Sequence, residues 1–133
     1  MISVLLATYN WPQALKLCLE SLSTQTELDF EIIIADDGST ADTKELIEAT
    51  QIEFPVKIRH LWQEDLGFRK TRILNQAIEA SIGDYLIFLD GDCIVQPDFI
   101  AQHRALSQEN HLVTGSRVLL NDELSKRLLS WPY

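Results

Sequence analysis

Two aspartates separated by a single glycine, Asp90 and Asp92, have the residue types and the spacing for chemistry. They follow an unbroken apolar run, 85–89, which predicts a strand buried on both faces of a parallel sheet. Two carboxylates this close repel each other unless a cation lies between them, and Mg²⁺ and Mn²⁺ prefer such oxygen ligands. Gly91 lets a backbone or a ligand approach closely. The pattern predicts a site for Mn²⁺ or Mg²⁺ on Asp90 and Asp92, and a plain polar strand end is the alternative.

Polar clusters also follow two other predicted strands. Residues 2–7 and 30–35 are mostly apolar, read as strands, and lead into Thr8-Tyr9-Asn10 and into Asp36-Asp37-Gly38-Ser39. The carboxyl ends of parallel strands meet at one edge of a sheet, where open α/β sheets bind their ligands. We therefore expect all three clusters to contribute to one binding site.

The elements that must position these residues alternate along the chain. Apolar periodicity predicts helices over 12–22, 40–51, 69–81 and 97–108, and two further strands over 56–62 and 112–118. Ser39 or Thr40 is expected to cap the second helix and Gly83 to end the third. Such regular alternation predicts an α/β fold whose mostly parallel sheet has helices on both faces, and 133 residues correspond to a single domain, 1–133.

Composition excludes several function classes. A formal net charge of −9 argues against a general binder of nucleic acid or of anionic membranes, so an anionic substrate needs a local cation cluster. Arg69, Lys70 and Arg72 form such a cluster, with a solvated helix face as the alternative for at least one of them. We find no apolar run of about 18 residues and no signal peptide. Cys18 and Cys93 form no metal-type spacing and no disulfide framework, which predicts a cytoplasmic location.

Four motifs in order resemble glycosyltransferase family 2, whose members have the GT-A fold. The motifs are Thr8-Tyr9-Asn10, Ile34-Ala35-Asp36-Asp37-Gly38-Ser39-Thr40, Glu64-Asp65-Leu66-Gly67-Phe68-Arg69 and Leu89-Asp90-Gly91-Asp92-Cys93. The Gly-Phe-Arg form of the third motif is similar to that of bacterial enzymes that build capsular, chondroitin-like or lipopolysaccharide chains. The resemblance covers almost the whole chain and identifies it with the N-terminal, donor-binding part of such an enzyme.

The resemblance also implies roles for individual residues. Asp37 accepts a hydrogen bond from uracil, Asp92 is the more direct metal ligand of a DXD motif, and Asp90 reaches the ribose or the metal. Leu74 stands where many relatives carry Arg, so which of the three cations replaces it stays open. The donor-binding set implied in this way is Thr8, Tyr9, Asn10, Asp37, Gly67, Arg69, Lys70, Arg72, Asp90, Gly91 and Asp92.

The activity implied by the resemblance is inverting transfer of a sugar from a nucleoside diphosphate, with UDP favoured, to a glycan or lipid-linked acceptor. Such an enzyme serves bacterial surface polysaccharide synthesis in the cytoplasm or at the periphery of the inner membrane. The resemblance implies a catalytic base well downstream of the DXD motif, beyond Tyr133, and a helix start explains Asp122 and Glu123, the only carboxylates of the tail. The domain is then incomplete, and its apolar Leu128, Leu129 and Trp131 need cover from a missing segment or a second copy.

Two other functions remain open from the sequence. The chain could be a non-catalytic or truncated module that binds a nucleotide sugar. More remotely, Asp90 and Asp92 could be the nucleophile and the proton shuttle of a haloacid-dehalogenase-like phosphatase. The phosphatase hypothesis explains neither the Asp36-Asp37-Gly38-Ser39 cluster nor Gly67-Phe68-Arg69.

Overall fold

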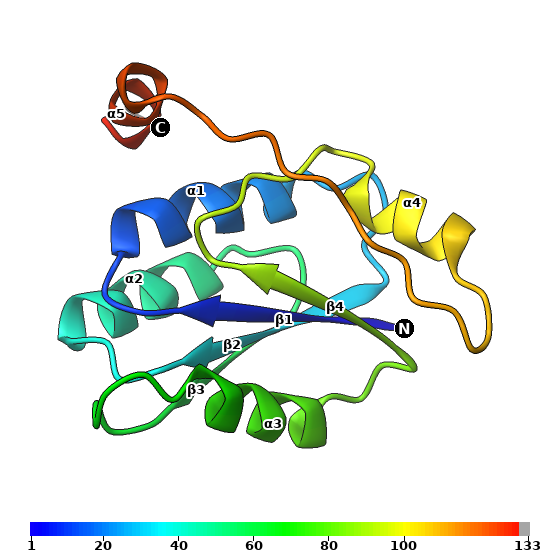
Figure 1. The fold of residues 1–133 in the computed structure, drawn as a ribbon, viewed down its shortest axis with the longest axis horizontal. Helices are drawn as coiled ribbons and strands as arrows, with labels where there is room; N and C mark the ends of the chain where they lie inside the picture. Colours follow the sequence, from blue (N-terminus) through cyan, green and yellow to red (C-terminus); the bar gives the residue numbers. More distant parts are fainter. Residues whose placement is uncertain (131–133) are drawn as a thin grey trace.

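The computed structural model describes residues 1–130, and Trp131 lies outside the described residues (Figure 1). The strands are β1 (Ile2–Thr8), β2 (Phe30–Asp36), β3 (Ile58–Trp62) and β4 (Tyr85–Asp90). The helices are α1 (Pro12–Ser23), α2 (Ala41–Gln51), α3 (Lys70–Ala80), α4 (Phe99–Leu106) and α5 (Asp122–Leu129). Within residues 1–130, none of these helices has the length and apolar character needed to cross a membrane.

The four strands form one parallel sheet in the order β3-β2-β1-β4. β1 therefore lies between β2 and β4, and Leu5 is in register with Ile33 on one side and with Phe88 on the other. Along the chain, β2 pairs with one side of β1 and β3 pairs with β2. The chain then crosses to the other side of β1, where β4 pairs. This reversal is the topological switch point at which α/β sheets bind ligands, and it brings the ends of β1, β2 and β4 together.

Helices cover both faces of the sheet, as the alternating pattern predicts (Figure 1). On one face α1, α2 and α4 bury the side chains of the even-numbered β1 residues. That core includes Ile2, Val4, Leu6, Leu15, Leu19, Ile47 and Ile100. The opposite face is covered by α3, and its smaller core is Leu5, Ile33, Ala35, Ile73 and Ala77.

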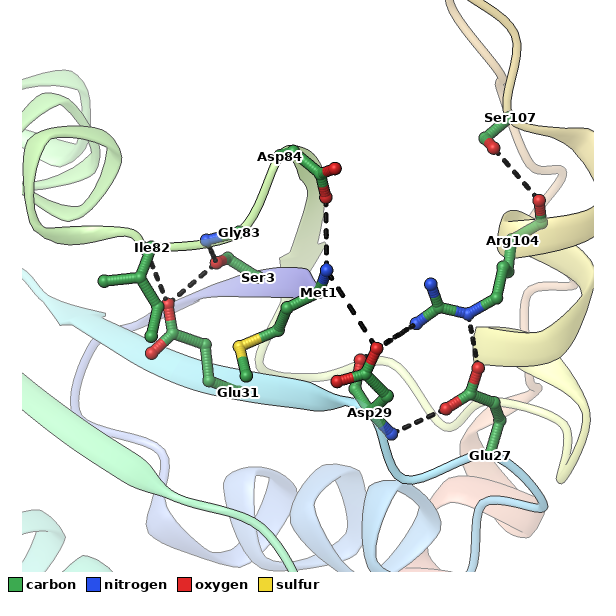
Figure 2. Close-up of polar contacts among 10 residues, drawn as sticks. All are labelled: Met1, Ser3, Glu27, Asp29, Glu31, Ile82, Gly83, Asp84, Arg104 and Ser107. Atoms are coloured by element: carbon green, nitrogen blue, oxygen red, sulfur yellow. Dashed lines mark hydrogen bonds and ion pairs between the residues drawn. The ribbon is translucent and has the colours of Figure 1, made fainter.

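A buried carboxylate, Glu31, ties the amino-terminal ends of the strands together (Figure 2). Its Oε1 accepts hydrogen bonds from Ser3 Oγ at 2.7 Å and from Ile82 N at 3.0 Å, and its Oε2 accepts one from Arg59 at 3.0 Å. Ser3 Oγ in turn accepts from Gly83 N at 2.9 Å. These contacts join β1, β2, β3 and the segment before β4, and they compensate the burial of a charged group.

The amino-terminal residue, Met1, contacts the same end of the sheet through exposed ion pairs (Figure 2). The Met1 ammonium lies 3.2 Å from Asp84 Oδ1 and 4.0 Å from Asp29 Oδ2. Arg104 on α4 pairs with both Glu27 and Asp29. Because these groups are largely solvated, the contacts orient α4 more than they stabilise the fold.

The expected fifth strand over 112–118 is wrong. This segment contains no strand, and Leu112 and Val118 are each 88% exposed. An extended segment becomes a strand only when a neighbour takes up its backbone hydrogen bonds. Within residues 1–130 the outer edge of β4 does not pair with this segment, so the sheet has four strands.

Several predicted boundaries also shift. β3 begins at Ile58 rather than at residue 56, and α4 begins at Phe99, after the Pro97-Asp98 turn. Thr40 stands at the N-cap of α2, but its hydroxyl bonds Asp42 Oδ1 at 2.5 Å instead of a helix amide. α3 ends at Ala80, before Gly83. A Cβ on Gly83 would lie 2.6 Å from Ser3 Oγ, so this glycine permits close packing rather than ending a helix.

Candidate functional site

A cavity of about 350 Å³ opens at the carboxyl ends of β1, β2 and β4. Each of the four sequence motifs contributes to its wall. The predicted residues that line it are Thr8, Tyr9, Asp37, Gly67, Lys70, Asp90, Gly91 and Asp92, and the others are Ala7, Trp11, Ala35, Asp65 and Phe68. The convergence expected from parallel strands is therefore observed, and its volume suits a small-molecule ligand.

One end of the cavity is marked by Asp37, which is only 6% exposed. Gln63 Nε2 donates to its Oδ1 at 2.7 Å, and the backbone N–H of Arg69 donates to its Oδ2 at 2.8 Å. Both donors come from the connection between β3 and α3. They hold the carboxylate in one orientation while it still faces the cavity.

The neighbouring Asp36 has a structural role. It is fully buried, its Oδ1 accepts from Ser39 N at 2.9 Å, and its Oδ2 lies 2.8 Å from His60 Nε2. Adjacent residues at the end of a strand point to opposite sides, which separates the two aspartates. Asp36 therefore braces the turn after β2, whereas Asp37 is available to a ligand.

The other end of the cavity carries the Asp90-Gly91-Asp92 motif. Lys70 Nζ lies 2.6 Å from Asp90 Oδ1, and both side chains are partly exposed. Gly91 N donates to Ala7 O at 2.7 Å, and a Cβ on Gly91 would lie 2.9 Å from that oxygen. The glycine is required for close contact with β1, which sets the two carboxylates on either side of a tight turn.

The described residues contain no cluster of three or more His, Cys, Asp and Glu side chains that could hold a metal. Mg²⁺ is usually bound by one or two carboxylates together with substrate phosphates. Asp92 is exposed and accepts a weak contact from the Cys93 thiol at 3.8 Å, while Asp90 is paired with Lys70. The pair fits a cation that arrives with a phosphorylated ligand, and it does not form an all-protein metal cage.

Acidic and aromatic side chains outside the predicted donor-binding set also line the cavity, beside Tyr9. Tyr9 donates to Asp65 Oδ2 at 2.7 Å, which joins the β1 end to the β3–α3 connection. This hydrogen bond and the charge of Asp65 raise the pKa of the Tyr9 hydroxyl. Trp11 and Phe68 add exposed aromatic surface, 47% and 88% exposed. Asp65 and Phe68 stand in the third motif, from which the predicted site set takes only Gly67 and Arg69, and Gln63 directly precedes that motif.

Three predicted donor-binding residues do not line the cavity. Asn10 has a φ of 46° and accepts from Thr40 N at 2.8 Å, so it shapes the turn after β1. The Arg69 guanidinium donates to Glu64 O at 2.6 Å, and Arg72 is exposed on α3. Of the three clustered cations, Lys70 is the one that reaches the cavity.

The two acidic residues of the tail lie in the first turn of α5, as expected from a helix start. Asn121 Oδ1 caps this helix by accepting from Leu124 N at 2.8 Å. Neither Asp122 nor Glu123 lines the cavity formed by the described residues. Leu128 and Leu129 are half-buried and share a small cavity of about 70 Å³ with residues of α1, which gives them part of the cover they need.

Comparisons with known proteins agree with this architecture. The Bacillus subtilis (strain 168) protein named "Putative glycosyltransferase EpsH" is 36% identical over 113 residues, which are 84% of this chain and 32% of EpsH. Validoxylamine A glucosyltransferase of Streptomyces hygroscopicus subsp. jinggangensis is 32% identical over 102 residues, 75% of this chain and 24% of that protein. The chain therefore spans about a third or less of the length of these relatives.

A solved structure has the same fold. The crystal structure of S. aureus TarS 1-349 in complex with UDP-GlcNAc matches with a TM-score of 0.66 at 25% identity, over 78% of this chain and 30% of that one. The expected GT-A fold is thus confirmed. The model of the family described as Glycosyl transferase family 2 matches residues 3–132. The chain belongs to glycosyl transferase family 2.

Proposed function

We propose that this chain binds the UDP-sugar donor of an inverting glycosyltransferase. The observation that carries the proposal is the convergence of four separate motifs on one cavity. An oriented carboxylate, Asp37, marks one end, and Lys70, Asp90 and Asp92 mark the other. This layout suits a ligand with a hydrogen-bonding base at one end and a diphosphate at the other.

In this proposal the chain's own residues bind and orient the donor. Asp37 accepts a hydrogen bond from the base, Lys70 offsets diphosphate charge, and Asp92, with Asp90, would hold Mn²⁺ or Mg²⁺. Such a cation would supply Lewis-acid stabilisation of the leaving diphosphate. The UDP-GlcNAc complex of the 25% identical TarS supports a uridine diphosphate donor.

The wider role is a proposal at the level of the whole enzyme. The product is a glycan or lipid-linked chain of bacterial surface polysaccharide, made in the cytoplasm or at the inner membrane periphery. Residues 1–133 serve as the donor-binding domain, and the catalytic base and the acceptor site lie beyond Tyr133. The greater length of the relatives supports this division of roles.

A non-catalytic donor-binding module is the second candidate. The hydrogen bonds and the ion pair made by the cavity carboxylates favour it. Asp37 is held by Gln63 and Arg69, Asp65 by Tyr9, and Asp90 by Lys70. Asp92 is at the proposed metal end. Each of these four described carboxylates thus has a partner or a proposed metal role, and we expect the chain alone to bind the donor without turning it over.

Calorimetric titration with UDP tests the proposal. We expect binding that depends on Mn²⁺, and Asp92→Asn should weaken it by at least about tenfold, because one charged ligand of the cation is lost. Asp98→Asn is the matched control, because Asp98 is exposed and bonds Gln102 at 3.0 Å away from the cavity wall. Absence of any nucleotide binding would contradict the proposal, and so would phosphatase turnover.

A further inference from the structure

Gln63, the first residue after β3, has a buried amide behind the cavity wall. The residue as a whole is only 8% exposed. Nε2 donates to Asp37 Oδ1 at 2.7 Å and to Arg69 O at 3.0 Å. Oε1 is buried and has no hydrogen-bond partner among residues 1–130.

The orientation of this amide follows from its surroundings. Exchanging the nitrogen and the oxygen would place Oε1 against two acceptors, Asp37 Oδ1 and Arg69 O, and would leave Asp37 without its donor. A buried acceptor without a partner destabilises the fold. Each such exception calls for an explanation, and this one lies beside a carboxylate of a residue that lines the cavity.

The two contacts to Asp37 leave it able to receive a ligand. Each carboxylate oxygen has two acceptor positions, and the protein fills one position on each oxygen, with Gln63 on Oδ1 and Arg69 N on Oδ2. Asp37 lines the cavity whereas Gln63 and Arg69 do not, so the two donors fix the carboxylate and leave its remaining acceptor positions for a ligand. Such a surface favours a ring that presents an N–H and disfavours one that presents a ring nitrogen lone pair.

We propose that Gln63 is a positioning residue that sets nucleobase selectivity through Asp37. By holding the carboxylate in place, it makes the site select a base with a ring N–H, such as N3–H of uracil, against cytosine, whose N3 is an acceptor. This inference rests on the nucleotide-sugar binding proposed above and specifies how that site chooses its donor.

The test is the ratio of UDP to CDP affinity, measured by calorimetry with Mn²⁺ for the wild-type chain and for Gln63→Met. Met matches the length of Gln without its donor and removes the orphaned oxygen. The wild-type chain should prefer UDP by about a hundredfold, and the variant should lose about tenfold of that preference. In an Asp37→Asn background Gln63→Met should change the ratio no further, because its effect passes through Asp37.

Gln25→Met is the matched control. Gln25 is 6% exposed, donates to Ser21 O at 3.0 Å and to Gln96 O at 2.8 Å, and accepts from Ile100 N at 3.0 Å, outside the cavity wall. Its substitution should lower the melting temperature and leave the affinity ratio unchanged. If Gln63→Met does not fold, Gln63→Asn, whose shorter amide does not reach Asp37, should show the same loss of selectivity.

The outcomes separate the two proposals. If the wild-type chain binds UDP and the Gln63 variants keep its selectivity, the role of Gln63 is overturned and the proposed function stands. The same holds if the variants weaken UDP and CDP equally, since that is the effect of a merely structural residue. If the wild-type chain binds no nucleotide, both proposals fail together.

Discussion

At the scale of single residues, Glu31 shows how hydrogen bonds decide the state of a buried charge. Burial alone would raise the pKa of this carboxyl, but hydrogen bonds from Ile82 and Ser3, together with Arg59, outweigh it and lower the pKa below the ordinary value of 4.5. A carboxyl with a lowered pKa in the folded state stabilises the fold fully above pH 4.5. That contribution disappears as the pH falls through the folded-state value.

Glu31→Gln tests this dependence. At pH 7 the substitution should lower the free energy of unfolding by about 2 kcal/mol, because charge-assisted hydrogen bonds are lost and a donor is left facing Ser3, Ile82 or Arg59. The difference from wild type should shrink as the pH falls below 4.5. Urea unfolding at pH 7 and pH 3 measures it.

Glu48→Gln provides the comparison for this pair of measurements. Glu48 is 63% exposed and pairs with Lys44 on the same helix, so its loss should change stability by less than about 0.5 kcal/mol at either pH. A Glu31→Gln effect that is equally large at both pH values would rule out the ionised carboxylate as its source.

At the scale of elements, the connection between β3 and α3 forms one wall of the cavity and depends on two glycines. Gly38 has a φ of +97°, and a Cβ there would lie 2.6 Å from the Asp65 backbone. Gly67 has a φ of +87°, with no heavy atom within 4 Å of the corresponding position. Gly38 allows the turn after β2 to pack against the connection. Gly67 is needed only because the backbone there has a positive φ.

Alanine at each position separates these effects. Gly67→Ala should destabilise the chain by about 1 kcal/mol, the approximate strain of a left-handed backbone with a Cβ. Gly38→Ala should lose about 2 kcal/mol more, because the new methyl group also displaces the Asp65 backbone. Thermal or urea unfolding measures both, and equal losses would mean that the Gly38 contact with Asp65 does not matter for stability.

At the scale of the whole molecule, the two faces of the sheet are covered unequally. α1, α2 and α4 cover one face, while α3 packs over β1, β2 and β3 on the other. On that second face Phe88 of β4, the register partner of the buried Leu5, is 57% exposed. The larger core therefore lies on the side of α1, α2 and α4, and each edge strand, β3 and β4, has one buried residue.

Leu5 and Phe88 are register partners on that second face and give a direct comparison. Leu5 is completely buried, so Leu5→Ala should lower the free energy of unfolding by about 3 kcal/mol. Phe88→Ser removes a larger side chain, but it should change stability by less than about 1 kcal/mol, because much of the ring is already in water. Urea unfolding compares them, and a larger loss for Phe88→Ser would mean that this face is buried in solution.

Local pattern was sufficient to predict four strands, their parallel α/β arrangement and most of the cavity wall. Tyr85 to Asp92 illustrates why: an unbroken apolar run predicts a strand of a parallel sheet, and such a strand delivers the residues at its end to the edge of the sheet. The expected burial of this strand on both faces is wrong, because β4 is an edge strand in which only Ile87 is buried. The metal-binding role of Asp90 and Asp92 stays a prediction, as does a base beyond Tyr133. The strands and the residues at their ends could be predicted because both depend only on neighbouring residues in the sequence.

Contacts between distant segments decided the rest. Asp36 and Asp37 are adjacent and chemically identical, yet His60 takes one and Gln63 holds the other. Lys70 reaches the cavity where Arg72 does not, because helix geometry points them in different directions. Residues 112–118 have a strand-like pattern but no partner strand within residues 1–130. Side-chain type is local, but burial, hydrogen-bond partners and strand pairing exist only once the chain has folded.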